Sequence, residues 1–167
     1  MHRETLLIVS MLLMIGAATA YGVDKKTFAK TASQSGHFEM MSGELAQEKS
    51  KSAEVKNFAK MMVEDHGGAV HKLDKIAEEA GVKSVESGVG QKTKYAAHMK
   101  MLQDAAPGVP FDEVYINIQR KTHQEAVAQF REYAENGDDP KLKQFAAETL
   151  PTLQAHVDHA MKLSPGS

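Results

Sequence analysis

Apolar residues recur every three or four positions over most of the chain, which is the spacing of amphipathic helices. Between Asp24 and Leu163 no stretch alternates apolar and polar residues at period two, so no strand is predicted. Four long helices are expected, each with one apolar stripe. The stripes hold Phe28, Ala32, Ser35, Glu39, Ser42 and Ala46; Val55, Phe58, Ala59, Met62, His66, Val70, Leu73 and Ala77; Phe111, Tyr115, Ile118, Thr122, Ala126 and Tyr133; and Leu142, Phe145, Ala146, Thr149, Leu153, His156, Ala160 and Leu163.

Glycine and proline mark the breaks between these helices. The Gly- and Ser-rich segment 81–91 predicts a loop, and a shorter helix is expected from Thr93 to Ala105. The Pro-Gly-Val-Pro segment 107–110 ends that helix, and the next long helix is expected from about Asp112 to Glu135. Pro151 is expected to kink the last helix or to displace its first part, because a proline inside a helix loses a hydrogen bond.

Four amphipathic helices bury their stripes most simply in one bundle. The chain also repeats a pattern: His-x-Glu is followed by Phe-Ala after 18 intervening residues in segment 37–59, and after 19 in segment 123–146. Either chance or duplication of a helical hairpin explains this repeat. Duplication would give an all-α, ferritin-like four-helix bundle, with the extra short helix lying in its long crossover.

The first 20 residues predict a secretory signal peptide. Arg3 precedes an apolar run of 14 residues from Thr5 to Ala18, and Ala18-Thr19-Ala20 has the small residues of a cleavage site. The run is shorter than the roughly 20 residues that a membrane-spanning helix needs. An uncleaved N-terminal anchor is the alternative. Cleavage would leave residues 21–167 as a single domain without a spanning segment, periplasmic or associated with the outer membrane.

Composition narrows the function classes. Apolar residues make up 42% and charged residues 25% of the chain, as in folded soluble proteins. With a net charge of −2 and no Trp, the chain lacks the basic excess and the stacking platforms of nucleic-acid binders, so nucleic acid is not an expected partner. The absence of Cys excludes disulfides, thiol catalysis and lipid acylation. No phosphate loop or Gly-x-Ser-x-Gly motif suggests an enzyme.

Polar residues stand inside the apolar stripes where Leu or Ala would be expected. Glu39, His66 and His156 lie on three different stripes, and His123 lies on the flank of the fourth. One carboxylate and three imidazoles, one from each long helix, form a ligand set suited to one Zn, Fe, Cu or Ni ion. The Glu-x-x-His signature of di-iron bundles is absent. The alternative is that the four side chains bond one another without metal. Both predict that they converge in the bundle interior.

Other histidines and the methionines give weaker signals. His71 lies about 140° around the helix from His66, so the two cannot share a ligand, and His159 is expected on a solvated flank. Adjacent methionines such as Met61-Met62 cannot face the same way on a helix, so core filling is their expected role.

Seven short motifs resemble those of one bacterial family. They are Phe38-Glu39, Leu45-Ala46, Glu54–Ala59, Met62–His66, Phe111-Asp112-x-x-Tyr115, His123-Gln124 and Leu150–His156. In combination they resemble the domain of unknown function numbered 4142 over about residues 24–163. The resemblance implies an exported, ferritin-like helical bundle, often labelled an outer membrane protein, and no established reaction. The pair Gly67-Gly68 departs from the polar helix formers expected after His66.

Two function classes are therefore open. The first is a non-enzymatic exported bundle, associated with the envelope or with envelope stress. The second is a metal-binding carrier or redox protein that uses Glu39, His66, His123 and His156. Neither the oligomeric state nor the metal follows from the sequence.

Overall fold

The computed structural model describes residues 23–82 and 94–166. This part of the chain contains five helices and no strand: α1 (Lys25–Lys49), α2 (Ala53–Glu79), α3 (Lys94–Asp104), α4 (Val109–Asn136) and α5 (Pro140–Lys162). The predicted signal peptide and most of the predicted loop 81–91 lie outside the described residues. Among the described helices, none is both long enough and apolar enough to cross a membrane.

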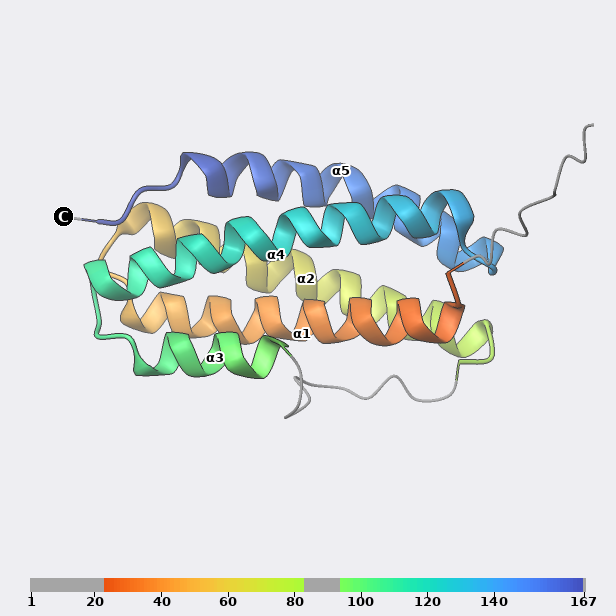
Figure 1. Cartoon of the computed structure of the whole chain (residues 1–167), viewed down its shortest axis with the longest axis horizontal. Coiled ribbons are helices and arrows are strands. Elements are labelled where there is room, and N and C mark those ends of the chain that lie inside the picture. The colour runs from red at the N-terminus through yellow and green to blue at the C-terminus, as the bar shows by residue number, and fades with distance from the viewer. Residues whose placement is uncertain (1–22, 83–93, 167) are drawn as a thin grey trace, which may run out of the picture.

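The four long helices form one bundle, as the apolar stripes predict (Figure 1). Helices α1 and α2 make one antiparallel hairpin, and α4 and α5 make the second. Between the hairpins the chain crosses back along the bundle, so α2 and α4 run in the same direction. The short helix α3 lies in this crossover and packs beside α1 and α4. The prediction of an all-α bundle with an extra short crossover helix is confirmed.

The starts of the long helices follow from local chemistry. Asp24, Ser52 and Asp139 each cap a helix with a side-chain oxygen that accepts a backbone N–H of the first turn. Helix α4 begins at Val109, three residues before the predicted start. Gly108 precedes it with φ of 83°, and Pro110 fits in the first turn because its missing N–H has no helical partner there.

Helix α5 continues through Pro151, so this proline does not displace the first part of the helix, and the alternative of a kink stays a prediction. A proline inside a helix costs about 3 kcal/mol. Leu142, Phe145 and Leu153, on both sides of Pro151, are buried in the core. Each such side chain contributes about 1.5–3 kcal/mol by leaving water. Packing on both sides therefore outweighs the local cost, and Pro151 itself is exposed.

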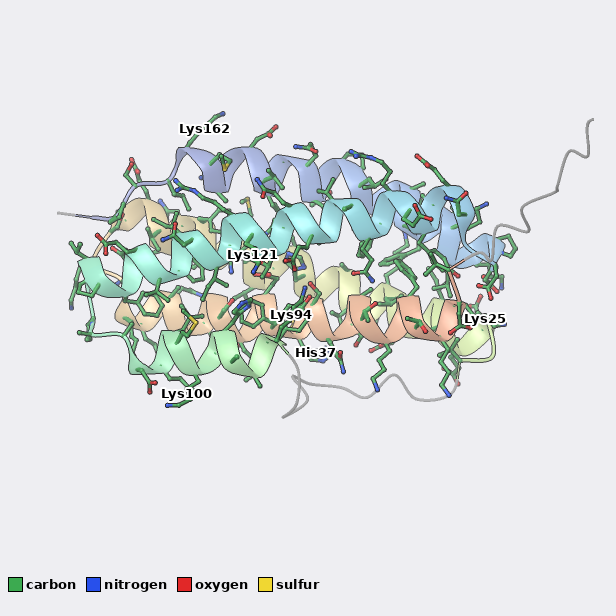
Figure 2. The ribbon with its side chains drawn as sticks, in the orientation of Figure 1. Lys25, His37, Lys94, Lys100, Lys121 and Lys162 are labelled. Atoms are coloured by element: carbon green, nitrogen blue, oxygen red, sulfur yellow. The ribbon has the colours of Figure 1, made fainter. Side chains whose placement is uncertain are left out.

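The core divides into two apolar clusters along the bundle. One contains Phe28 and Phe130, and the other contains Phe38 and Phe111. Charged side chains such as those of Lys100 and Lys162 point outward (Figure 2). Buried polar side chains gather where the two clusters meet; they include Ser35, Glu39, Ser42, His66, Gln119, Thr122, His123 and His156. The structure therefore places a polar layer in the middle of an otherwise apolar bundle.

The two His-x-Glu segments of the sequence repeat have different environments. In the first, Glu39 is buried and His37 is half-buried; in the second, His123 is buried and Glu125 is half-buried and paired with Lys94. Each hairpin thus buries one polar residue of its motif, which is the Glu in the first hairpin and the His in the second. Superposition of the two hairpins stays a prediction.

Candidate metal centre

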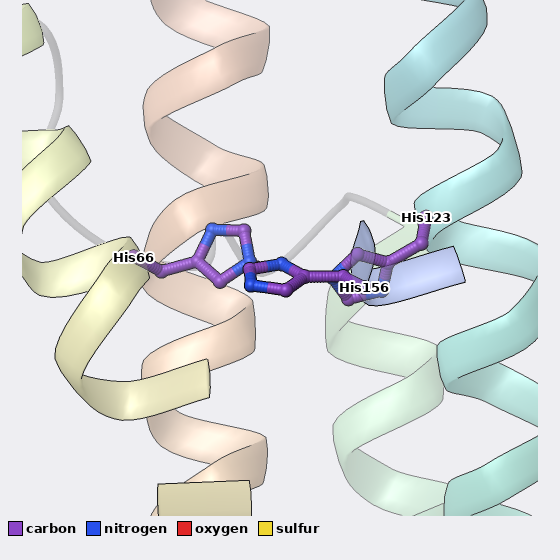
Figure 3. A group of neighbouring side chains, drawn as sticks. All are labelled: His66, His123 and His156. Carbon is purple, nitrogen blue, oxygen red and sulfur yellow. The ribbon is translucent and has the colours of Figure 1, made fainter. Parts of the chain in front are cut away.

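Three imidazole rings from three different helices meet in the polar layer (Figure 3). His66 of α2, His123 of α4 and His156 of α5 are only 7%, 1% and 2% exposed. Each offers a ring nitrogen, and the three nitrogens lie within 4.8 Å of one another. The convergence expected from the sequence holds for these three residues.

The shortest approach in this His66–His123–His156 cluster is 3.3 Å, between Nε2 of His66 and Nε2 of His123. Two nitrogens that each lie 2.0–2.1 Å from one tetrahedral metal ion are roughly 3.3 Å apart. This pair therefore already has the separation that a shared ion would impose. The ligand nitrogen of His156 lies within 4.8 Å of both.

The tautomer of His123 is fixed by the backbone of its own helix. Its Nδ1 lies 3.0 Å from the carbonyl oxygen of Gln119, one helical turn earlier. A carbonyl oxygen only accepts, so Nδ1 carries the proton and donates it. A neutral imidazole has one N–H, and Nε2 of His123 therefore presents a lone pair toward the cluster. Metal-binding histidines commonly hold their second nitrogen in this way.

His156 is held by an acidic side chain on another helix. Its Nε2 lies 2.9 Å from Oδ2 of Asp65 on α2, so the carboxylate accepts this N–H. The other nitrogen, Nδ1, is buried and has no hydrogen-bond partner among the described residues. A buried polar atom without a partner costs about 1–3 kcal/mol. A metal ion bound at Nδ1 would satisfy it, and this orphaned lone pair is the clearest sign that the cluster fits a metal.

His66 completes the cluster with a nitrogen whose role depends on the ion. In the metal-free protein, Nε2 of His66 donates its proton to the lone pair on Nε2 of His123. For both nitrogens to bind a metal, the proton must move to Nδ1 of His66. That change of tautomer requires no rearrangement of the helices.

All three imidazoles are neutral near pH 7. Burial lowers the pKa of His66 well below its usual 6.5 and that of His123 to about 4, and it also lowers the pKa of His156. Repulsion from the other two rings lowers the pKa of His66 further, whereas the hydrogen bond to Asp65 acts against the lowering of the pKa of His156. Metal ions bind the neutral form, so the ligands need not lose a proton to the solvent first.

Glu39, the fourth predicted residue, is buried in the same layer but its oxygens are engaged. Nε2 of Gln119 donates to Oε2 at 2.6 Å, and Oγ1 of Thr122 donates to Oε1 at 2.9 Å. Burial raises the pKa of Glu39 to about 7, against the lowering effect of these two bonds and of nearby His156. The partner that a buried carboxylate requires is thus supplied by α4. Glu39 reaches the cluster indirectly, because Gln119 contacts both Glu39 and His123.

Sequence reasoning ranked His123 below the other three residues, because it lies on the flank of its stripe. The structure buries it fully, since α4 turns a wide face toward the core that also includes Gln119 and Thr122. Asp65 was not singled out either. Its partner His156 is 91 positions away in the chain, and no local pattern signals such a pair. The expected solvated positions of His71 and His159 are confirmed, for both are exposed.

Comparison with known proteins places the chain in context. The family described as Domain of unknown function (DUF4142) matches residues 13–163. No curated protein sequence matches the chain. Two solved structures are similar in fold: CopM in the Cu(II)-bound form and CopM in the Cu(I)-bound form. Each has a TM-score of 0.68, 15% sequence identity and coverage of 83% of this chain; the coverage of the CopM chain is 94% and 93%, respectively. At this identity the likeness concerns the fold.

Proposed function

The chain belongs to the DUF4142 family, and within that family we propose that its three buried histidines bind one transition-metal ion, with copper as the expected metal. The observation that carries this proposal is the arrangement of His66, His123 and His156. Each of the three rings places a nitrogen within 4.8 Å of the other two. The hydrogen bonds to the Gln119 carbonyl and to Asp65 leave a lone pair on Nε2 of His123 and on Nδ1 of His156. A buried nitrogen without a partner lowers the stability of the fold unless a ligand such as a metal ion binds to it.

Copper is the expected metal for two reasons. Imidazole nitrogen is a strong ligand for Cu, and divalent copper binds most tightly in the usual series of first-row metals. Two solved structures with a similar fold are of CopM, in its Cu(II)-bound and Cu(I)-bound forms. Zn, Ni and Fe also accept imidazole and serve as the comparison ions in the test.

A binding or carrier role is favoured over catalysis. Catalytic metals keep a coordination position that a substrate can reach. Here the cluster residues are at most 7% exposed, and α1 covers the fourth side of the layer with Glu39. The carboxylate of Glu39 would offset part of the positive charge of a bound ion. We infer that the protein stores or carries the ion rather than using it on a substrate.

We also propose that the protein is exported from the cytoplasm. The predicted signal peptide at residues 1–20 would deliver the bundle to the periplasm, with or without association with the outer membrane. Copper handling outside the cytoplasm fits such a destination. Intact mass of protein recovered from the periplasm should correspond to residues 21–167, and full-length chain in the cytoplasm would contradict export.

Metal titration tests the proposal directly. The protein is expressed as the full chain, purified, freed of metal, and titrated with Cu(I) and Cu(II) against a coloured competing chelator, and with Zn, Ni and Fe(II) in parallel. We expect one tightly bound copper ion per chain. His66→Ala and His123→Ala should weaken that binding at least about tenfold.

His71→Ala is the matched control, because His71 lies on the same helix as His66 but faces solvent. It should bind copper as the parent does. Circular dichroism shows whether each variant is folded, and His123→Gln replaces His123→Ala if the latter is not. No copper binding by the parent, or equal binding by all folded variants, would return the cluster to a purely structural role.

A further inference from the structure

An open groove of about 390 Å³ lies on the outer side of the histidine cluster, between α2 and α5. Four of its lining side chains carry metal-binding atoms: Met61, Asp65, His156 and His159. Met61 is half-exposed, and Asp65 and His159 are exposed. The groove therefore offers a thioether, a carboxylate and an imidazole to ions in the solvent.

His156 belongs to both the groove and the cluster. Its Nε2 is bonded to Asp65, which lines the groove, while Nδ1 is buried without a partner. The ring is 2% exposed, so it separates the two spaces. An ion that leaves the groove for the cluster meets this one side chain, whose Nδ1 carries the free lone pair.

His159 is positioned by a contact rather than left free in solvent. Its ring lies edge-on to the ring of Phe58, with the centroids 5.1 Å apart. Phe58 is itself fully buried in the core. This contact therefore holds the ring of His159 in place on one side, although the residue is exposed. His159 follows His156 by three residues, so both project from neighbouring turns of α5.

The other space beside the cluster does not suit an ion. A cavity next to His66 is enclosed almost entirely by apolar side chains, among them Val70, Leu73, Phe130 and Leu153. Only Ser35, His66 and Thr149 among its lining residues have polar side chains, so an ion crossing it would lose water with few replacement ligands, which is unfavourable. Of the two spaces, the groove is the one that adds a carboxylate and a thioether.

We propose that the groove formed by Met61, Asp65 and His159 is the entry site at which a copper ion is captured before it passes His156 into the cluster. This inference rests on the proposed function. A thioether with an imidazole favours Cu(I), while the carboxylate also accepts Cu(II), so the groove suits an ion in either state. The entry site is weaker than the cluster, because its ligands are exposed to water. It therefore acts on the rate of loading more than on the final affinity.

Loading kinetics test the entry site. The double variant Met61→Leu/His159→Asn removes both groove ligands and leaves Asp65 and all three cluster histidines in place. Stopped-flow mixing of the metal-free protein with Cu(II) and with chelated Cu(I) should show loading slowed by about tenfold. The equilibrium affinity of the cluster should stay within about twofold of the parent, because no cluster ligand or cluster hydrogen bond is changed.

The matched control is Met101→Leu/His71→Asn, which makes the same two substitutions at exposed positions that do not line the groove. It should load at the parent rate. A second readout uses His66→Ala, in which weak copper binding should persist and should disappear when the two groove substitutions are added.

The outcomes separate the two proposals. A parent that binds no copper overturns both. A parent that binds copper and a groove variant that loads at the parent rate overturn the entry site alone. Slow loading of the control pair to the same extent would also overturn it, because the effect would then not belong to the groove.

Discussion

Nε2 of His66 and Nε2 of His123 lie 3.3 Å apart, although 57 positions of chain separate the two residues. They belong to α2 and α4, which are in different hairpins of the bundle. Neither ring is charged near pH 7, and each is almost fully removed from water. Their contact therefore depends on the relative position of the two hairpins, and it makes stability and metal binding sensitive to the same few side chains.

Removal of a cluster histidine should destabilise the metal-free protein more than removal of a solvated one. His156→Ala leaves a cavity and takes away the partner of Asp65, so the free energy of unfolding should fall by about 1–3 kcal/mol. His71→Ala, at an exposed position of α2, should change it by less than about 0.5 kcal/mol. Urea unfolding of the two variants measures the difference, and equal small effects would contradict the packing of the cluster.

Acid should remove the stability that the neutral ring of His123 contributes to the metal-free protein. The pKa of His123 falls from 6.5 to about 4 on folding, so the unfolded state binds protons that the folded state refuses. Stability contributed by the neutral ring is present above pH 6.5 and is lost as the pH falls toward 4. At about 1.4 kcal/mol for each pH unit, this loss is roughly 3 kcal/mol.

The pH dependence is measured by urea unfolding between pH 7 and pH 4. His123→Leu should lose less stability than the parent over this range, since it has one buried base fewer. Parallel pH curves for the parent and His123→Leu would show that the ring of His123 is not held neutral in the folded state.

Glu39 should have the opposite effect. Its pKa rises from 4.5 to about 7 on folding, so the neutral carboxyl is favoured in the folded state. Its contribution is fully present below pH 4.5 and is lost as the pH rises through 7. Glu39→Gln cannot ionise, so its free energy of unfolding should rise relative to the parent between pH 5 and pH 8, by up to about 3 kcal/mol.

The variant amide can still bond to Gln119, whose Oε1 has no partner in the described structure. Glu44→Gln, at an exposed position of α1, is the control and should show no such trend. Parallel pH curves for the parent and Glu39→Gln would mean that the carboxylate is ionised in the folded protein throughout this range.

Two glycines should respond oppositely to alanine. A Cβ at Gly43 would lie 2.8 Å from the carbonyl oxygen of Ala59 and 2.9 Å from Cγ2 of Val63, so Gly43→Ala should push α1 from α2 and cost about 1–2 kcal/mol. At Gly68 nothing lies within 4 Å of the added atom. Gly68→Ala should stabilise the helix by about 1 kcal/mol. Thermal unfolding compares them, and a stabilised Gly43→Ala would contradict the close approach.

The spacing of apolar residues along the chain is enough to identify the helices and the faces that they bury. The stripe read for α2, from Val55 to Ala77, is the set of residues that the helix buries. Periodicity has this power because a helix rotates each side chain by a fixed angle, so the spacing of apolar residues alone identifies the face that leaves water. The same reasoning found the polar exceptions Glu39, His66 and His156.

Packing of the helices against one another selects which of these polar residues meet. The His66–His123 contact and the His156–Asp65 pair depend on how far each helix slides and turns against its neighbours, and packing of the whole core sets those displacements. It turned the flank residue His123 inward and gave Glu39 to Gln119 and Thr122. It also carried α5 through Pro151, since burial on both sides of the proline outweighed a local preference. The local pattern of residues determines which face of each helix is buried, whereas packing of the whole bundle determines which residues meet across helices.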